Sequence, residues 1–142
     1  RSAQLLAAGP IAGLETAGVG GTSWARVEAF RAAGALSRET GFALGGFGVP
    51  TTESVIACRA ALPDRLVIAS GGLRTPEQMA TCLALGADAV ACAKPFLEAA
   101  QGGVDAVIAL IDRYVHLLRV LCFVCGAPTP RDLRGRVDRL GV

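Results

Sequence analysis

The sequence VIASGGLRTPEQMATCLALGADAVACAKPFL, residues 67–97, contains a strand, a small-residue turn and a helix start twice in succession. The run at residues 66–69 is continuously apolar, which is typical of a strand covered on both faces. After it, Thr75 can cap a helix that has Pro76 at its first position and Gln78 as the capping-box partner. The spacing therefore predicts a strand followed by a helix.

The second half of this stretch repeats that order. Residues 89–92 form another apolar run, and Lys94 and Pro95 open the next helix. Upstream, residues 11–17 are a third strand candidate, followed by a glycine cluster and by a helix that Ser23 can cap. Strand and helix alternate three times, which predicts an α/β fold with parallel crossovers.

The remaining segments are predicted to be helices and one loop. The helix after Ser23 has apolar side chains every three residues, which predicts one packed face, at Trp24, Val27, Phe30 and Ala33. Further helices are expected at residues 2–8, from Thr51 or Thr52 to before Pro63, at 104–125 and at roughly 130–140, with a glycine-rich loop at 37–50.

Composition limits the possible functions. With 142 residues, 52% of them hydrophobic and 18% charged, we expect a single globular domain over residues 1–142. The net charge of +2 without a dense basic stripe argues against a nucleic-acid or anionic-membrane partner. The longest apolar segment, residues 104–124, is interrupted by charged side chains, so we expect a buried helix and no membrane span.

Cysteine usage indicates reduced thiols. The five cysteines are an odd number and lie among apolar neighbours, at Cys58, Cys82, Cys92, Cys122 and Cys125. Because no signal peptide follows Arg1, we expect a cytoplasmic protein with buried thiols. The last two cysteines form a C-x-x-C motif in a helical run, but no further Cys pair or His cluster completes a metal site. His116 is expected to be an ordinary residue of the same helix.

Two of the loops that follow strands suggest phosphate binding. In a (β/α) barrel such loops emerge at one face, where main-chain N–H groups can point at an anion. In the first loop, Gly71 and Gly72 allow close backbone approach, and Arg74 adds charged donors. In the second loop, the amides of Ala93 and Lys94 precede a helix start. Either loop could instead contain glycines and small residues only to make a tight turn.

The third loop, residues 18–24, differs in its side chains. Its glycines permit the approach of a flat ligand, and Thr22 offers a hydroxyl to a phosphate or a ring heteroatom. Trp24 is the single tryptophan of the chain, and it can be either a ligand contact or a helix core residue.

Four segments together resemble the type 2 isopentenyl-diphosphate isomerases. GVGGTSWARVEAFR (18–31) is similar to that family's G-x-G-G-T-S-W-x-x-x-E-x-x-R signature, and GFGVPTTESV (46–55) to its W/F-G-I/V-P-T segment. The block at 67–97 and LCFVCGAPTPRDLRG (121–135) resemble the two later segments of the family. The Gly-Gly-Thr-Ser-Trp string is the specific part, whereas many FMN barrels share the block at 67–97 more loosely.

The resemblance implies a fold, a reaction and a set of site residues. The expected fold is a partial (β/α)8 TIM barrel, about strands 6–8, with C-terminal helices. The expected reaction is the FMN-dependent conversion of isopentenyl diphosphate to dimethylallyl diphosphate, with NADPH as reductant, Mg²⁺ on the diphosphate and a homo-oligomeric protein. FMN binding is assigned to Thr22, Gly71, Gly72, Leu73, Arg74, Ala93 and Lys94, and a place in the substrate pocket to Trp24.

The sequence also departs from the family. Ala17 stands where Ser or Gly is common, Lys94 where Arg is usual, and Cys122 where Met is usual. The family's earlier half, which carries the catalytic His, Asn and Gln and the magnesium-binding Glu, has no counterpart here, so no catalytic residue is assigned and the chain alone is expected to be inactive. The alternatives are another FMN barrel of the α-hydroxy-acid oxidase type, whose His-Gly-Gly-Arg string is not found here, or a truncated chain that binds no flavin.

Overall fold

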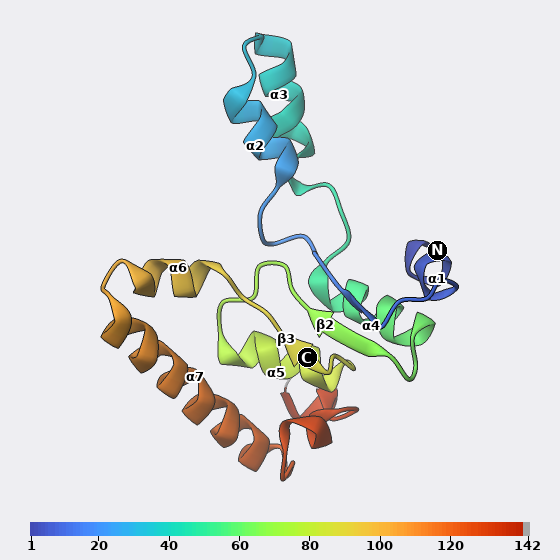
Figure 1. The fold of residues 1–142 in the computed structure, drawn as a ribbon, viewed down its shortest axis with the longest axis vertical. Helices are drawn as coiled ribbons and strands as arrows, with labels where there is room; N and C mark the ends of the chain where they lie inside the picture. Colours follow the sequence, from blue (N-terminus) through green and yellow to red (C-terminus); the bar gives the residue numbers. More distant parts are fainter. Residues whose placement is uncertain (141–142) are drawn as a thin grey trace.

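A three-stranded parallel sheet with helices packed around it is the centre of the computed structural model, which describes residues 1–140 (Figure 1). The strands β1 (Gly13–Glu15), β2 (Leu66–Ala69) and β3 (Ala89–Val90) lie in the order β1-β2-β3. Gly13 pairs with Leu66, and Ile68 pairs with Ala89. The α/β class predicted from the alternation of strands and helices is therefore confirmed.

Helices connect and cover the strands. They are α1 (Ser2–Ala7), α2 (Trp24–Arg31), α3 (Ala35–Ala43), the 3₁₀ turn η1 (Leu44–Gly46), α4 (Thr51–Ala61), α5 (Pro76–Ala84), α6 (Lys94–Ala100), α7 (Val104–Val124) and the 3₁₀ turns η2 (Pro130–Leu133) and η3 (Val137–Leu140). The start of α5 is as predicted, because the Thr75 hydroxyl accepts from the Gln78 N–H while the Gln78 side chain accepts from the Thr75 N–H.

Helix α5 lies at the centre of the core and contributes to three apolar clusters. Its Cys82 packs with Val55 of α4 and with Ala69 of β2. Its Met79 packs with Leu110 and Tyr114 of α7. A third cluster joins α5 to the end of α7 and to η2, at Ala80, Leu83, Ala84, Cys122, Cys125, Ala127 and Leu133. Because α5 is buried on several sides, it fixes the position of the loop that precedes it.

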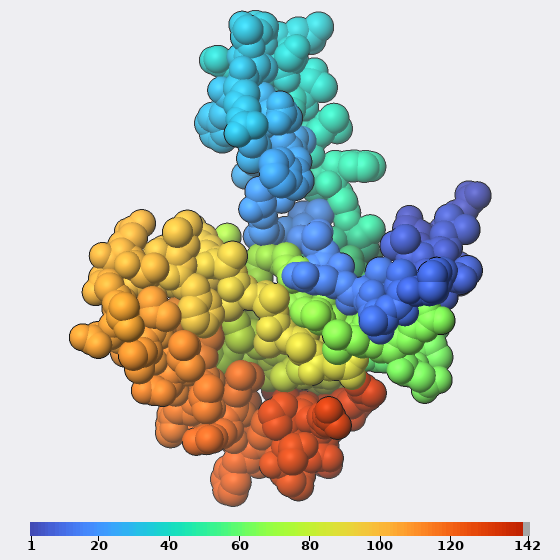
Figure 2. All heavy atoms as spheres, viewed as in Figure 1, coloured from blue at the N-terminus to red at the C-terminus, as the bar shows by residue number. Residues whose placement is uncertain are grey.

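Helices α2 and α3 form a hairpin that extends away from the rest of the chain (Figures 1 and 2). The prediction of a loop over residues 37–50 was wrong for its first part, which belongs to α3. Gly41 lies inside this helix, where a Cβ would come within 2.6 Å of the Ala25 carbonyl oxygen and 2.8 Å of the Ala29 Cβ. This glycine therefore allows the two helices to approach closely, a role that sequence reasoning mistook for a loop signal.

The apolar face predicted for α2 is mostly outside the core. Among all the residues of helix α2 only Ala29 is buried, whereas Trp24 and Phe30 of the predicted face are 72% and 75% exposed. Phe30 instead meets Phe42 of α3 edge-on, with ring centroids 5.1 Å apart. The Ser23 cap was predicted correctly, since its side chain accepts from the Arg26 N–H.

Several element boundaries differ from the expectations. The strands predicted at 11–17 and 89–92 are shorter, and Leu66 at the start of β2 is 46% exposed, so β2 is not covered on both faces. Neither Thr51 nor Thr52 caps α4, whose N-cap is Pro50. The helix predicted at about 130–140 is two 3₁₀ turns, because Gly135 between them takes a positive φ of 80°.

A charged cluster joins the amino ends of β2 and β3. The Asp88 carboxylate accepts from the Val67 N–H at 2.9 Å, from Arg134 at 2.6 Å and from Arg59. Burial raises the pKa of Asp88. The hydrogen bonds from Val67, Arg134 and Arg59 and the charge of Arg59 lower it by more than burial raises it, so the pKa lies below its usual value. Arg59 also donates to the Gly86 carbonyl at 2.8 Å. This cluster stabilises the end of the sheet opposite the loops considered next.

Candidate functional site

Three loops that follow the three strands meet around one hollow of about 500 Å³. They are residues 17–24 after β1, 70–74 after β2 and 91–94 after β3. All eight residues that the sequence singled out line this hollow: Thr22, Trp24, Gly71, Gly72, Leu73, Arg74, Ala93 and Lys94. The parallel strands bring these loops together, because the carboxyl ends of all three strands lie at the same edge of the sheet.

The first two loops pack backbone against backbone. Gly18 donates its N–H to the Ser70 carbonyl at 3.1 Å. Gly71 has a φ of 110°, and a Cβ there would lie 2.3 Å from the Gly18 oxygen. Gly72 has a φ of 76°, and its Cβ would lie 2.2 Å from the Gly20 carbonyl carbon. These glycines are therefore required first for the contact between the two loops, and through it for the shape of the hollow.

Two buried threonines that sequence reasoning did not place at the site hold the same loops. Thr16, only 4% exposed, donates its hydroxyl to the Ser70 carbonyl at 3.1 Å and accepts from the Ser70 N–H at 3.0 Å. Thr51, at the start of α4, donates to the Gly71 carbonyl at 2.5 Å. The available signal was a hydroxyl residue at each element end, but its partner lies 54 or 20 residues away in sequence and cannot be identified from spacing.

The hollow presents hydrogen-bond donors and positive charge. Among residues 1–140, the N–H groups of Gly72, Leu73, Ala93 and Lys94 donate to no protein acceptor, whereas the Arg74 N–H is taken up by the Gln78 side chain at 2.8 Å. Arg74 and Lys94 add cationic side chains at its rim. The described residues that line it include no carboxylate and no histidine. Such a surface suits an anionic ligand and offers neither a carboxylate nor a histidine as a general acid or base.

Further residues also line the hollow without having been predicted: Ala17, Gly18, Gly21, Ser70, Ala91 and Cys92. Cys92 is half-buried, and burial raises the pKa of its thiol, so the group is neutral at pH 7. The expectation of buried thiols holds for Cys82, Cys122 and Cys125, whereas Cys58 and Cys92 are partly accessible.

Other candidates from the sequence lie outside this hollow. His116 is an exposed residue of α7. Cys122 and Cys125 are free, buried thiols in the core, and no three His, Cys, Asp or Glu side chains of residues 1–140 are arranged to bind a metal ion. Within the same residues, no helix combines the length and the apolar character needed to cross a bilayer.

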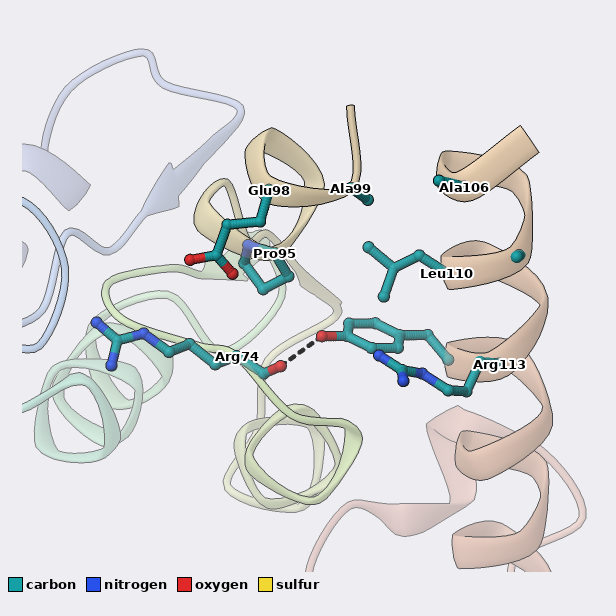
Figure 3. A pocket seen from close by; sticks show the side chains of 9 residues that line it. Arg74, Pro95, Glu98, Ala99, Ala106, Leu110 and Arg113 are labelled. Carbon is teal, nitrogen blue, oxygen red and sulfur yellow. Dashed lines mark hydrogen bonds between the residues drawn. The ribbon is translucent and has the colours of Figure 1, made fainter. Parts of the chain in front are cut away.

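A second hollow, of about 620 Å³, lies between α6 and α7 and shares Arg74 with the first (Figure 3). Its walls are mostly apolar, from Pro95 and Ala99 of α6 to Leu110 of α7. Tyr114 also lines it, and its hydroxyl donates to the main-chain carbonyl of Arg74, a bond drawn as a dashed line in Figure 3. This contact links the longest helix directly to the loop after β2.

Comparison with known proteins identifies the family. The sequence profile described as FMN-dependent dehydrogenase matches residues 37–137, which include the loops after β2 and β3. The chain belongs to the FMN-dependent dehydrogenase family. Membership links the chain to FMN, while the loop at 18–24 lies before the matched residues.

Three relatives of this chain share the name isopentenyl-diphosphate delta-isomerase. The isopentenyl-diphosphate delta-isomerase of Mycolicibacterium vanbaalenii is 43% identical over 127 residues, which is 89% of this chain and 36% of the relative. The proteins of that name from Methanococcoides burtonii and Deinococcus radiodurans are 39% and 42% identical over 93% and 92% of the chain, and it covers 36% and 38% of them. The chain thus spans little more than a third of the length of these isomerases, and the resemblance noted in the sequence is confirmed.

Proposed function

We propose that this chain forms part of the FMN-binding face of an isopentenyl-diphosphate delta-isomerase of isoprenoid biosynthesis, which interconverts isopentenyl and dimethylallyl diphosphate. The names of the relatives support the reaction, and the family supports the cofactor. The observation that carries the proposal is the convergence of all eight predicted residues on one hollow with unpaired main-chain donors.

The donors of the hollow fit the FMN phosphate. The free N–H groups of Gly72 and Leu73 lie in one loop and those of Ala93 and Lys94 in another, so two short segments can donate to one anion. Arg74 adds a charged donor at the same rim. Once bound and reduced, FMN supplies the proton chemistry at the allylic carbons of the substrate. The residues of this chain hold the phosphate and the flavin in place.

Side chains of the first loop complete the proposed site. The Thr22 hydroxyl lines the hollow and can donate to a phosphate or accept from a ring N–H of the flavin. Trp24, which is 72% exposed at the start of α2, offers an apolar wall to the substrate. In this proposal any carboxylate or histidine that assists the flavin in moving protons comes from outside the described lining, which has neither.

The proposed architecture is a (β/α)8 barrel in which β1 to β3 are about strands 6–8. The parallel order β1-β2-β3 and the helices between the strands support it. NADPH as the reductant, Mg²⁺ on the substrate diphosphate and assembly into a homo-oligomer are parts of the same proposal.

The test is to produce the protein at its full natural length and to measure released flavin and isomerisation of isopentenyl diphosphate with NADPH and Mg²⁺. Arg74→Ala is expected to weaken FMN binding about tenfold, the effect of one charge-assisted hydrogen bond. Binding of riboflavin, which lacks the phosphate, is expected to stay unchanged. Arg38→Ala, on the distant α3, is the matched control. A purified protein without flavin and without affinity for FMN would refute the proposal.

A second candidate is oxidation of a 2-hydroxy acid, the alternative drawn from the sequence; the description of the matched family supports FMN-dependent dehydrogenation. The absorbance of the bound flavin distinguishes the two activities. An oxidase or dehydrogenase would lose its oxidised flavin absorbance when a 2-hydroxy acid is added without oxygen, and an isomerase would not. We expect no bleaching by lactate or glycolate under these conditions.

A further inference from the structure

The main chain of Arg74 is held at both its N–H and its carbonyl. Its N–H donates to the Gln78 side-chain oxygen at 2.8 Å, and its carbonyl accepts from the Tyr114 hydroxyl of α7. The first partner is four residues away and belongs to the α5 capping box, whereas the second is forty residues away in sequence. Only the second ties the loop to a separate element of the fold.

Tyr114 is well suited to be a fixed donor. The residue is buried, packs with Met79 and Leu110, and meets Phe96 edge-on with ring centroids 6.3 Å apart. Burial raises the pKa of its phenol, so the hydroxyl keeps its proton at neutral pH. The bond to Arg74 is the dashed line in Figure 3.

The Arg74 carbonyl lies at the end of the loop that carries two of the main-chain donors. The Gly72 and Leu73 N–H groups have no protein acceptor among residues 1–140. The Gly72 N–H shares its peptide with the Gly71 carbonyl, which accepts from Thr51, so the loop is held near its start. The hydrogen bond from Tyr114 holds the same loop at its end, one residue after the Leu73 donor. The two bonds together restrain the segment that carries both donors.

We propose that Tyr114 is a positioning residue for the phosphate-binding loop, and that its hydroxyl, through the Arg74 carbonyl, sets the affinity for the phosphate group of the flavin ligand. This inference rests on the proposed function. It assigns to α7, which contributes no residue to the lining of the first hollow, a role in selecting a phosphorylated ligand over an unphosphorylated one.

The experiment compares FMN with riboflavin on the full-length protein freed of flavin. Tyr114→Phe removes the hydroxyl and retains the ring, and we expect FMN affinity to fall about three- to tenfold, the effect of one buried hydrogen bond. Riboflavin affinity is expected to stay the same. Leu110→Val perturbs the same apolar cluster without touching the hydrogen bond, so it is expected to lower stability and to leave the ratio of the two affinities unchanged.

Three results decide between the hypotheses. A selective loss of FMN affinity in Tyr114→Phe, together with a shifted ³¹P resonance of bound FMN that Leu110→Val does not show, supports the positioning role. Equal changes for FMN and riboflavin, or no change for either, would overturn it while leaving the proposed function standing. Failure of the unmodified protein to bind FMN would overturn both.

Discussion

The substitution Gly72→Ala is expected to disrupt the contact between the loops after β1 and β2. Gly72 has a φ of 76°, and adoption of a left-handed conformation by a residue with a Cβ costs about 1–2 kcal/mol. The new Cβ would also lie 2.2 Å from the Gly20 carbonyl carbon and 2.4 Å from its oxygen. Because both atoms belong to the backbone, one loop must move, and overpacking of this kind costs about 1–3 kcal/mol. Together, these two costs are expected to lower the free energy of unfolding by about 2–5 kcal/mol.

Gly103→Ala provides a control for the part of this stability loss that comes from backbone conformation. Gly103 has a φ of 90°, but nothing lies within 4 Å of the position of an added Cβ. Because its ψ of −174° puts it in a backbone region that is essentially restricted to glycine, Gly103→Ala is expected to lose about 1–3 kcal/mol from conformation alone. Urea unfolding of the full-length protein gives both values, and FMN titration shows whether the hollow survives. If Gly72→Ala destabilises no more than Gly103→Ala and binds FMN normally, the two loops do not form the contact described here.

Further predictions concern charge, thiols and activity. Asp88→Asn should lower the free energy of unfolding by about 2–3 kcal/mol, since Arg59 and Arg134 lose a charged acceptor. Because the folded-state pKa of Asp88 is lowered, its stabilising contribution is present at neutral pH and lost as the pH falls through that pKa; the urea midpoint of the native protein should fall more steeply in acid than that of Asp88→Asn. Cys92 lines the hollow and should be protected by FMN from a thiol reagent, whereas Cys58 should react at an unchanged rate. The isolated 142-residue chain should show no isomerase turnover, and any turnover would contradict the proposal that side chains outside it are needed for catalysis.

The parts of the fold that could be predicted from the sequence are those with local causes. The capping box at Thr75 and Gln78 is complete within four residues, and the α5 helix begins where it predicts. β2 and β3 were found because each is a short apolar run that small residues end, and β1 (Gly13–Glu15) lies in the short segment before a glycine cluster. The common location of the loops follows from the parallel order alone, so the candidate site could be assembled before any distance was known.

The parts that were missed depend on contacts across the chain. Gly41 looks like a loop residue, yet it lies in a helix because Ala25 and Ala29 approach it from α2. Thr51 looks like a cap, yet its hydroxyl donates to the Gly71 carbonyl. Tyr114 gave no signal, since its partner is the main chain of a residue forty positions away. In each case the deciding partner is distant in sequence, and residue type alone does not reveal it.

The glycines of the two loops explain why departures from the family pattern need not abolish the proposed site. Gly18, Gly71 and Gly72 bring main chain against main chain, and the donors left over are N–H groups that every residue type except proline possesses. Lys94 in place of the usual arginine retains its N–H and a positive charge, and Ala17 removes only a side-chain contact. Recognition that depends on the backbone is thus sensitive to substitutions that displace a loop and tolerant of those that exchange a side chain. Gly72→Ala should consequently harm FMN binding more than Lys94→Arg does.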